Sequence, residues 1–301
     1  MTMTKSGFVA ICGQPNVGKS TILNGLVREK VAITSSKPET TRDNVRGILT
    51  EGETQMIFVD TPGIHKPHDL LGKMMLARAE SSIMESDVIL FVTEKHTAFN
   101  KDDLNIRDRL ITSASDKKVI FVVNKSDKVK DKRSLLPLMQ KAQDFYPFNE
   151  IFPMSALKKP DLIRLLKLVK SYLPEGPFLY PEDQLTDKSD TFMIREIIRE
   201  KILERTFREI PHSVAVTVEA MEERTPGGML DVSVVIFVER TSQKSILIGK
   251  DGEMMKRIGE SARKEIEKLI SRKVWLTLWV KVAEKWKKNP SSLHELGYSD
   301  E

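Results

Sequence analysis

The sequence predicts an α/β domain with a mostly parallel sheet and helices on both faces, followed by a smaller α+β domain. A length of 301 residues is enough for two domains. From residue 7 to about 172, strand-like and helix-like stretches alternate, which is typical of a parallel sheet. A stretch rich in proline and acidic residues follows, and the order then changes to helix, strand, strand, helix, helix, strand. We therefore expect domains at 1–173 and 191–301, joined by a linker at 174–190.

Hydrophobic periodicity assigns the individual elements. In the first domain, strands are expected at Phe8–Cys12, Val45–Thr50, Gln55–Asp60, Val88–Thr93, Val119–Asn124 and Glu150–Met154. Helices are expected there at Lys19–Val27, Lys73–Met84, Asp102–Thr112, Lys132–Phe145 and Asp161–Tyr172. In the second domain, the main helices are expected at Phe192–Glu209 and Glu253–Leu269, and the strands at Val214–Ala220, Asp231–Glu239 and Val274–Val282. Ligands of open α/β sheets bind at the carboxyl ends of the strands.

The composition is that of a globular protein, with 40% hydrophobic and 30% charged residues. The one cysteine, Cys12, excludes a disulfide framework and indicates a reducing compartment. The sequence has neither the apolar core of a signal peptide nor an apolar run long enough to span a bilayer. We expect a monomeric cytoplasmic protein, and peripheral contact with the cell membrane stays open.

The first motif follows the first expected strand and matches G-x-x-x-x-G-K-[ST]. It consists of Gly13, Gln14, Pro15, Asn16, Val17, Gly18, Lys19 and Ser20, with Thr21 next in the expected helix. In such a loop, successive backbone N–H groups and the helix N-terminus hold phosphates. Lys19 would contact the β- and γ-phosphates, and Ser20 would ligate Mg²⁺. The alternative, a glycine-rich turn with an incidental lysine, does not account for the strand–loop–helix context.

The second motif selects the base, and it is the run Asn124, Lys125, Ser126 and Asp127. A carboxylate at Asp127 can accept hydrogen bonds from both N1–H and the 2-amino group of guanine, whereas adenine offers no such pair of donors. We expect the aliphatic stem of Lys125 to cross the base plane. A short run after the last strand would contact the guanine O6 through its backbone: Ser155, Ala156 and Leu157. The two motifs together predict a site for GTP and GDP.

A third motif, D-x-x-G, closes the third expected strand with Asp60, Thr61, Pro62 and Gly63, followed by Ile64. Asp60 would hold the Mg²⁺ shell through water, and the N–H of Gly63 would approach the γ-phosphate. Some GTPases have a glutamine directly after this motif, which orients the attacking water. Because Ile64 is aliphatic, it cannot do so, and we expect slow hydrolysis.

Two further features concern the γ-phosphate. A threonine hydroxyl at Thr40 or Thr41 can close onto Mg²⁺ when the γ-phosphate is present, which is a disorder-to-order switch; the spacing does not decide between them, and Thr41 is favoured. The carboxamide of Asn16 could help to coordinate a potassium ion that adds positive charge beside the phosphates. The alternative is that Asn16 only stabilises the turn. The expected catalytic residues are Lys19, Asn16, Thr41 and Gly63.

The second domain carries a basic segment, residues 240–288, with 14 basic and 6 acidic side chains. Within it lies a G-x-x-G run, Ile248, Gly249, Lys250, Asp251 and Gly252. This loop and the order of elements fit a type II KH domain, which clamps about four nucleotides of single-stranded RNA. The alternative is a small α+β domain with a tight turn. We expect Trp275 and Trp279 to pack beneath a helix rather than stack on bases, and Trp286 to lie on the RNA side.

Both halves together resemble the Era family of bacterial GTPases, over the whole length. The resemblance rests on GQPNVGKS, TTR, DTPG, NKSD and SAL in the first half, and on REIIREK, VER, IGKDG, LWVKV and LGY in the second. It implies a ribosome-assembly GTPase that acts on the 30S subunit. Its KH domain would bind the 3′ end of 16S ribosomal RNA, and GTP would favour the RNA-competent state. It also implies a cytoplasmic location with some membrane association. One departure is Lys159, near a position where the family usually has glycine.

Three other functions explain these residues less well. A metabolic P-loop kinase or ATPase does not need Asp127 or Thr41. A binding module with a degenerate GTPase domain does not need Lys19 or Asp60. A membrane-signalling GTPase without an RNA role does not account for the G-x-x-G loop within a basic segment.

Overall fold

The computed structural model describes residues 4–225 and 227–298, which form two compact units. The first unit comprises the chain up to residue 67 together with 72–187, and the second comprises 68–71 and the chain from residue 188. For the functional domains we still propose the limits 1–173, 174–190 and 191–301. In the part of the chain that the structure describes, no helix is both long and apolar enough to cross a membrane.

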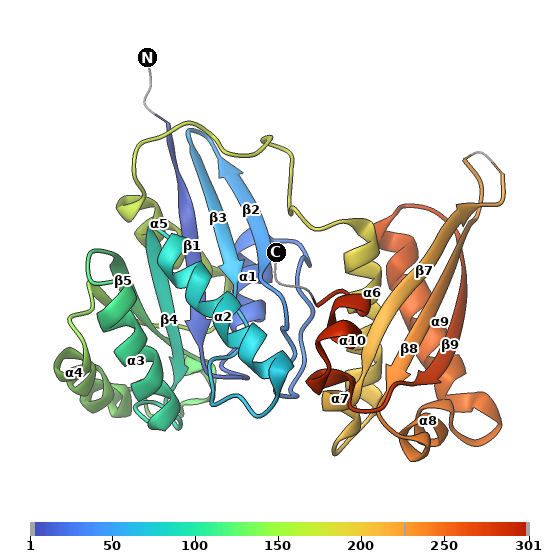
Figure 1. The fold of residues 1–301 in the computed structure, drawn as a ribbon. Coiled ribbons are helices and arrows are strands. Elements are labelled where there is room, and N and C mark those ends of the chain that lie inside the picture. Colours follow the sequence, from blue (N-terminus) through green and yellow to red (C-terminus); the bar gives the residue numbers. More distant parts are fainter. Residues whose placement is uncertain (1–3, 226, 299–301) are drawn as a thin grey trace. The chain divides into compact units, whose positions relative to one another are not determined.

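A six-stranded sheet forms the centre of the first unit, in the order β2-β3-β1-β4-β5-β6 (Figure 1). Its strands are β1 (Lys5–Gly13), β2 (Val45–Glu51), β3 (Thr54–Asp60), β4 (Val88–Glu94), β5 (Lys118–Asn124) and β6 (Glu150–Pro153). All neighbouring pairs are parallel except β2 with β3. The predicted mostly parallel sheet is therefore confirmed, and all six strands lie where the apolar runs placed them.

Helices cover both faces of this sheet (Figure 1). They are α1 (Lys19–Val27), α2 (Leu70–Glu85), α3 (Lys101–Ser113), α4 (Leu136–Phe145) and α5 (Lys159–Tyr172). Helix α4 begins four residues later than expected, and Lys132–Leu135 form a 3-10 turn instead. The reason is Pro137, which lacks an N–H and is tolerated only in the first turn of a helix.

One core cluster of the first unit lies between the sheet and helices α2, α3 and α4, and consists of apolar side chains such as Phe91, Phe121 and Ile106. Cys12 is fully buried within it, and burial raises the pKa of its thiol to about 12. Cys12 is therefore a structural residue rather than a reactive thiol.

The segment between the two expected domains follows the first unit through residue 187. Backbone groups of Leu179 and Tyr180 donate hydrogen bonds to the Gln55 carboxamide, and the hydroxyl of Thr186 donates to the Arg46 carbonyl at 2.7 Å. This part of the linker is therefore ordered against strands β2 and β3.

The second unit is a three-stranded sheet in the order β7-β8-β9, with β7 antiparallel and β9 parallel to β8 (Figure 1). Its strands are β7 (Ala215–Glu223), β8 (Leu230–Val238) and β9 (Val274–Val282). Its helices are α6 (Asp190–Arg205), α7 (Ile210–Ser213), α8 (Thr241–Ile248), α9 (Glu253–Leu269) and α10 (Pro290–Glu295). Helix α6 starts earlier than expected because the Ser189 side chain caps it, accepting from the N–H of Phe192 at 3.2 Å. The predicted order of the main elements is confirmed.

Both expectations for the tryptophans are wrong. Trp286 is fully buried, its indole N–H donates to the Ser213 carbonyl at 2.9 Å, and its ring stacks on Tyr298. Trp275 and Trp279 are instead 53% and 61% exposed. Their places beneath the helices are occupied by the alternate residues of β9, which are aliphatic and join the core of the unit: Val274, Leu276, Leu278 and Val280.

The burial of Trp286 leads to a stability prediction. Trp286→Ala should lower the free energy of unfolding of the second unit by about 3–5 kcal/mol, because it removes a large buried ring and leaves the Ser213 carbonyl without its donor. Urea unfolding measures this change. Trp275→Ala is the matched control and should change stability by about 0.5 kcal/mol or less, since that ring is exposed. Equal losses in both variants would contradict the assignment.

Candidate nucleotide site and nucleic-acid surface

The loop between β1 and α1 lines a cavity of about 280 Å³, together with residues 34–41, Gly63 and Lys125. Lys19 lies at its base, where the ammonium group donates to the carbonyls of Gly13 at 3.1 Å and Gln14 at 2.9 Å. Burial lowers the pKa of Lys19, and the nearby Asp60 carboxylate opposes that shift. A cation held among backbone carbonyls in this cavity is suited to bind phosphate oxygens.

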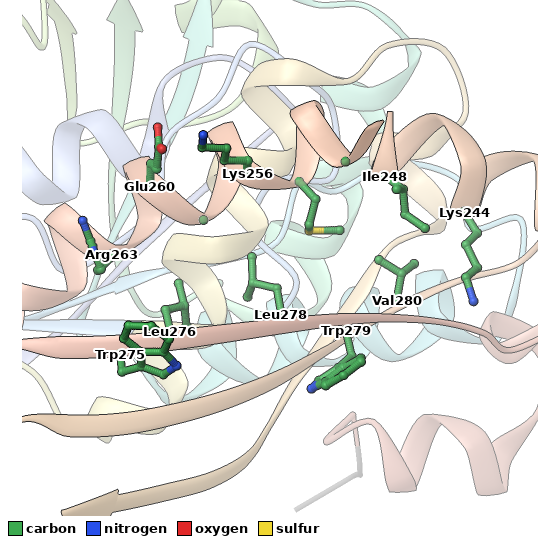
Figure 2. Close-up of a pocket in the computed structure, with 13 residues that line it drawn as sticks. Lys244, Ile248, Lys256, Glu260, Arg263, Trp275, Leu276, Leu278, Trp279 and Val280 are labelled. Atoms are coloured by element: carbon green, nitrogen blue, oxygen red, sulfur yellow. The ribbon is translucent and has the colours of Figure 1, made fainter. Parts of the chain in front are cut away.

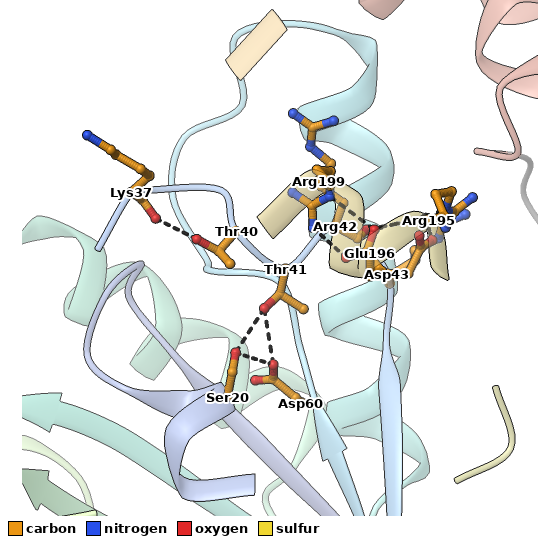
Figure 3. A network of polar contacts seen from close by, with 11 residues as sticks. Ser20, Lys37, Thr40, Thr41, Arg42, Asp43, Asp60, Arg195, Glu196 and Arg199 are labelled. Atoms are coloured by element: carbon orange, nitrogen blue, oxygen red, sulfur yellow. Dashed lines mark hydrogen bonds and ion pairs between the residues drawn. The ribbon is translucent and has the colours of Figure 1, made fainter. Parts of the chain in front are cut away.

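Ser20, Thr41 and Asp60 meet beside this cavity, although they are far apart in the sequence (Figure 3). The Ser20 hydroxyl donates to Asp60 Oδ2 at 2.6 Å, and the Thr41 hydroxyl donates to the same oxygen at 3.1 Å. The two hydroxyl oxygens are 3.1 Å apart. Thr40 instead donates to the Lys37 carbonyl at 2.7 Å. The structure therefore brings Thr41, and not Thr40, to the expected metal ligands.

These residues fit a magnesium ion. Asp60 is fully buried, and burial raises the pKa of its carboxyl group, against the effects of Lys19 and the two hydroxyls. Its Oδ1 atom has no hydrogen-bond partner among the residues that the structure describes. A buried carboxylate oxygen without a partner is costly, and a hard cation with oxygen ligands would remove that cost. When bound, Mg²⁺ supplies positive charge to the β- and γ-phosphates.

Asn124 joins the base-selecting motif to the phosphate loop. Its Nδ2 donates to the Val17 carbonyl at 2.8 Å, and its Oδ1 accepts from the N–H of Ala156 at 3.0 Å. A side chain at Gly18, which has a φ of 98°, would collide with Asn124. The Asn124 side chain thus connects the end of strand β5 with the loops that contain Val17 and Ala156.

Asp127 is exposed at the same end of the sheet. A hydrogen bond with Ser155 is the main cause that lowers the pKa of its carboxyl group. It therefore stays ionised at neutral pH and can accept two hydrogen bonds from a guanine edge. The ammonium of Lys125 binds the Asn16 carbonyl at 2.6 Å and the Glu94 carboxylate at 2.9 Å. The position of its stem across the base stays a prediction.

The D-x-x-G loop packs directly on the phosphate loop. A Cβ at Gly63 would lie 2.7 Å from Pro15 Cγ and 2.9 Å from Pro15 N, so this position excludes any side chain. Thr61 and Ile64 were also expected to lie at the nucleotide, but their side chains point away from the cavity. The Thr61 hydroxyl donates to the Ile11 carbonyl at 3.0 Å, and the Ile64 side chain is buried in the core. Ile64 can reach a nucleotide only through its backbone.

Two side chains of the phosphate loop are also occupied by protein partners. Gln14 Nε2 donates to Asp103 at 2.5 Å and to Asn100 at 3.0 Å, and Asn100 donates back to Gln14 at 3.0 Å. Sequence reasoning missed Asn100 and Asp103; the one signal was the capping position of Asn100 before α3. Asn16 has a φ of 65° and donates to the Ser36 carbonyl at 3.0 Å, so it links this loop to residues 34–41.

The second unit has a larger cavity, of about 580 Å³, between helices α8 and α9 and strand β9 (Figure 2). The G-x-x-G run lies at its end: α8 finishes at Ile248, and α9 starts at Glu253 after Gly252. Gly249 has a φ of 77°, and a Cβ there would lie 2.8 Å from Met254 Cβ. Three basic side chains, Lys244, Lys256 and Arg263, line the cavity. Glu260 is the acidic residue among the lining residues, so the charged part of the lining is mainly basic. A mainly basic, partly apolar cavity beside two helix ends suits a polyanionic strand.

The two threonines provide a matched test of the metal site. Thr41→Ala should lower the rate of GTP hydrolysis about 10- to 100-fold, because it removes a hydroxyl from the metal ligands. Thr40→Ala should leave the rate nearly unchanged, because its hydroxyl is bound to Lys37. Phosphate release at saturating Mg²⁺ and GTP measures both rates. If Thr40→Ala were the slower variant, the assignment would be wrong.

Comparisons with known proteins agree with this geometry. Residues 8–125 match the family model described as 50S ribosome-binding GTPase, and residues 209–287 match that of the KH domain. A crystal structure of Era in complex with MgGDPNP and nucleotides 1506–1542 of 16S ribosomal RNA is 41% identical, with a TM-score of 0.95. A tyrosine-to-alanine variant of Aquifex aeolicus Era bound to GDP and AlF4⁻ is 42% identical, with a TM-score of 0.94. Each alignment covers 99% of this chain and 100% of the other. The chain therefore belongs to the Era family of GTPases, in which a GTPase domain precedes a KH domain.

Proposed function

We propose that this protein is a GTP-binding and GTP-hydrolysing switch that binds the 3′ end of 16S ribosomal RNA and assists assembly of the 30S subunit. The observation that carries the proposal is the likeness, over 99% of the chain, to an Era structure that holds both MgGDPNP and nucleotides 1506–1542 of 16S ribosomal RNA. Both ligands have a matching cavity here, one in each unit.

In the first unit, Lys19 and the backbone of residues 13–20 would bind the phosphates. Ser20, Thr41 and Asp60 would hold Mg²⁺, and Asp127 would bind the guanine edge. The contact of Thr41 with Asp60 supports a γ-phosphate switch, because Thr41 belongs to the loop of residues 34–41 that lines the cavity. Thr41 would join the metal shell in the GTP state and leave it after hydrolysis.

Hydrolysis should be slow without a further activator. The Ile64 side chain lies in the core, so the position that holds glutamine in other GTPases has no polar group near the phosphates. We propose that Asn16 helps to hold a potassium ion beside the phosphates. Its Nδ2 is bound to Ser36, and a carboxamide oxygen is an oxygen ligand of the type that potassium accepts.

If Asn16 helps to hold potassium, GTP hydrolysis should be faster in potassium than in sodium buffer of equal ionic strength. The site would hold potassium in preference to the smaller sodium ion, and the bound ion would add positive charge beside the phosphates. Asn16→Ala should remove the difference between the two buffers. Equal rates of the unaltered protein in both would refute the role of potassium.

In the second unit, RNA binding would use the G-x-x-G loop and the basic cavity beside it. Residues 240–288 carry 14 basic and 6 acidic side chains, which favours a polyanion. We also propose that the protein is a monomer and acts in the cytoplasm. A second proposed location is the cytoplasmic face of the cell membrane.

Base selection has a direct test. Asp127→Asn should weaken GTP binding by about 100-fold or more, because an amide cannot accept both guanine hydrogen bonds. The same variant should bind XTP, which has an oxygen where guanine has its 2-amino group. Nucleotide competition titrations measure both affinities. A variant that binds GTP as tightly as the unaltered protein would exclude Asp127 from the base site.

RNA binding has a matched pair of variants. Lys250→Glu with Asp251→Glu should weaken binding of an RNA with the sequence of nucleotides 1506–1542 by about tenfold or more at near-physiological salt. Lys268→Glu, a charge reversal near the far end of helix α9, should cause a clearly smaller loss. Fluorescence anisotropy measures both. A membrane-signalling GTPase without an RNA role would bind no such RNA, and neither variant would then change anything.

A further inference from the structure

Strand β9 exposes two large aromatic rings. Trp275 is 53% and Trp279 is 61% exposed, while the aliphatic residues that alternate with them point toward helix α9 (Figure 2). Figure 2 shows both rings on the other side of the β9 ribbon from Leu276 and Leu278. More than half of each residue stays in contact with water, so folding leaves a large apolar area on this strand face that a partner could cover.

The rings lie next to the proposed RNA cavity. Both Trp275 and Trp279 line the cavity of about 580 Å³ that also contains Ile248 and Gly252 of the G-x-x-G run. Strand β9 is at the edge of the three-stranded sheet, and residues from both of its faces line the cavity. The path from one face of β9 to the other is therefore not blocked by a further strand. A single-stranded nucleic acid could therefore pass from the G-x-x-G loop to the outer face of β9.

The charges around the rings favour a polyanion over an apolar partner. Lys244, Lys256 and Arg263 line the same cavity with one acidic residue, Glu260, and the exposed Lys281 follows Trp279 on the same strand face. An apolar protein surface or lipid chain on the two indoles would have to desolvate these cations, whereas RNA would pair its phosphates with them.

Trp275 is held in place by a cation. The Arg224 guanidinium lies 5.0 Å from the centre of the Trp275 ring, and its Nε donates to the Asp231 carboxylate at 2.8 Å. Asp231 is the residue directly opposite Trp275 in the β8–β9 register. The ring is thereby oriented while more than half of its surface stays exposed. An oriented, accessible ring loses little conformational entropy when a base stacks on it.

We propose that Trp279 and Trp275 form a stacking platform for unpaired bases of the RNA, beyond the nucleotides clamped by the G-x-x-G loop. This inference rests on the proposed RNA binding and adds the residues that extend its footprint. Four residues of strand separate the rings by about 13 Å, so each ring takes its own base. A G-x-x-G loop alone clamps about four nucleotides. With the two rings, the protein would contact a longer stretch of the RNA. Stacking is tolerant of sequence, so the platform adds affinity rather than base selection.

Intrinsic fluorescence tests the contact directly, because the chain has three tryptophans and Trp286 is buried. An RNA with the sequence of nucleotides 1506–1542 should quench the fluorescence of the unaltered protein. Trp275→Phe and Trp279→Phe should each reduce the quenching, and the double variant, which keeps only Trp286, should abolish it. Undiminished quenching in the double variant would overturn the proposal.

Affinity gives an independent readout. Trp279→Ala should weaken RNA binding about 5- to 150-fold, the loss expected for one stacked base, with the salt dependence of binding unchanged. Thr277→Ala, between the rings on the same strand face, is the control and should bind RNA like the unaltered protein. All variants should keep their thermal unfolding midpoint, since the rings are exposed.

The outcomes separate this inference from the proposed function. If the unaltered protein binds the RNA and Trp275→Ala/Trp279→Ala binds it equally well, the platform is refuted, RNA binding stands, and the rings serve another partner. If the unaltered protein does not bind the RNA, both proposals fall.

Discussion

A fully buried carboxylate, Asp60, organises the nucleotide site. One of its oxygens accepts hydrogen bonds from Ser20 and Thr41, and the other has no partner among the described residues. Its charge is therefore only partly compensated by the protein. A magnesium ion bound to phosphates would complete the compensation, and Thr41 would follow the metal. The position of the loop at residues 34–41 would then depend on whether a γ-phosphate is present, which is the property that a GTPase switch needs.

The rest of the site keeps this arrangement rigid. Asn124 fixes the base loop to the phosphate loop, and Asn100 and Asp103 hold the side chain of Gln14 away from the cavity. Gly63 is packed on Pro15, so the D-x-x-G loop lies directly against the phosphate loop. The Ile64 side chain lies in the core, so the residue after D-x-x-G supplies no side chain that could orient water. The proposed slow hydrolysis would give a long-lived GTP state, which suits the proposed role in holding RNA.

Local patterns were enough to predict the sheet, most of the helix positions and the strand–loop–helix unit at residues 5–27, because each of these depends on near neighbours in the chain. Contacts between distant residues were not predictable in the same way. Strand β9 has large apolar side chains on both faces, Trp275 and Trp279 on one and aliphatic residues on the other. The size of the two indoles favoured burial, whereas Thr277 and Lys281 on their face were the signal that it is the exposed one. Trp286 lies among basic residues, and only its distant partners Ser213 and Tyr298 explain its burial. The choice of Thr41 over Thr40 likewise depends on the path of a loop.

We expect the bound nucleotide to control the affinity of this protein for RNA. The most direct measurement is the dissociation constant for an RNA with the sequence of nucleotides 1506–1542, determined for the magnesium complexes of GDPNP and of GDP at one salt concentration. The unaltered protein should bind the RNA more tightly with GDPNP than with GDP. For Thr41→Ala the ratio of the two dissociation constants should be near one, since that variant lacks the hydroxyl proposed to respond to the γ-phosphate. Equal affinity of the unaltered protein in both nucleotide states would contradict this expectation.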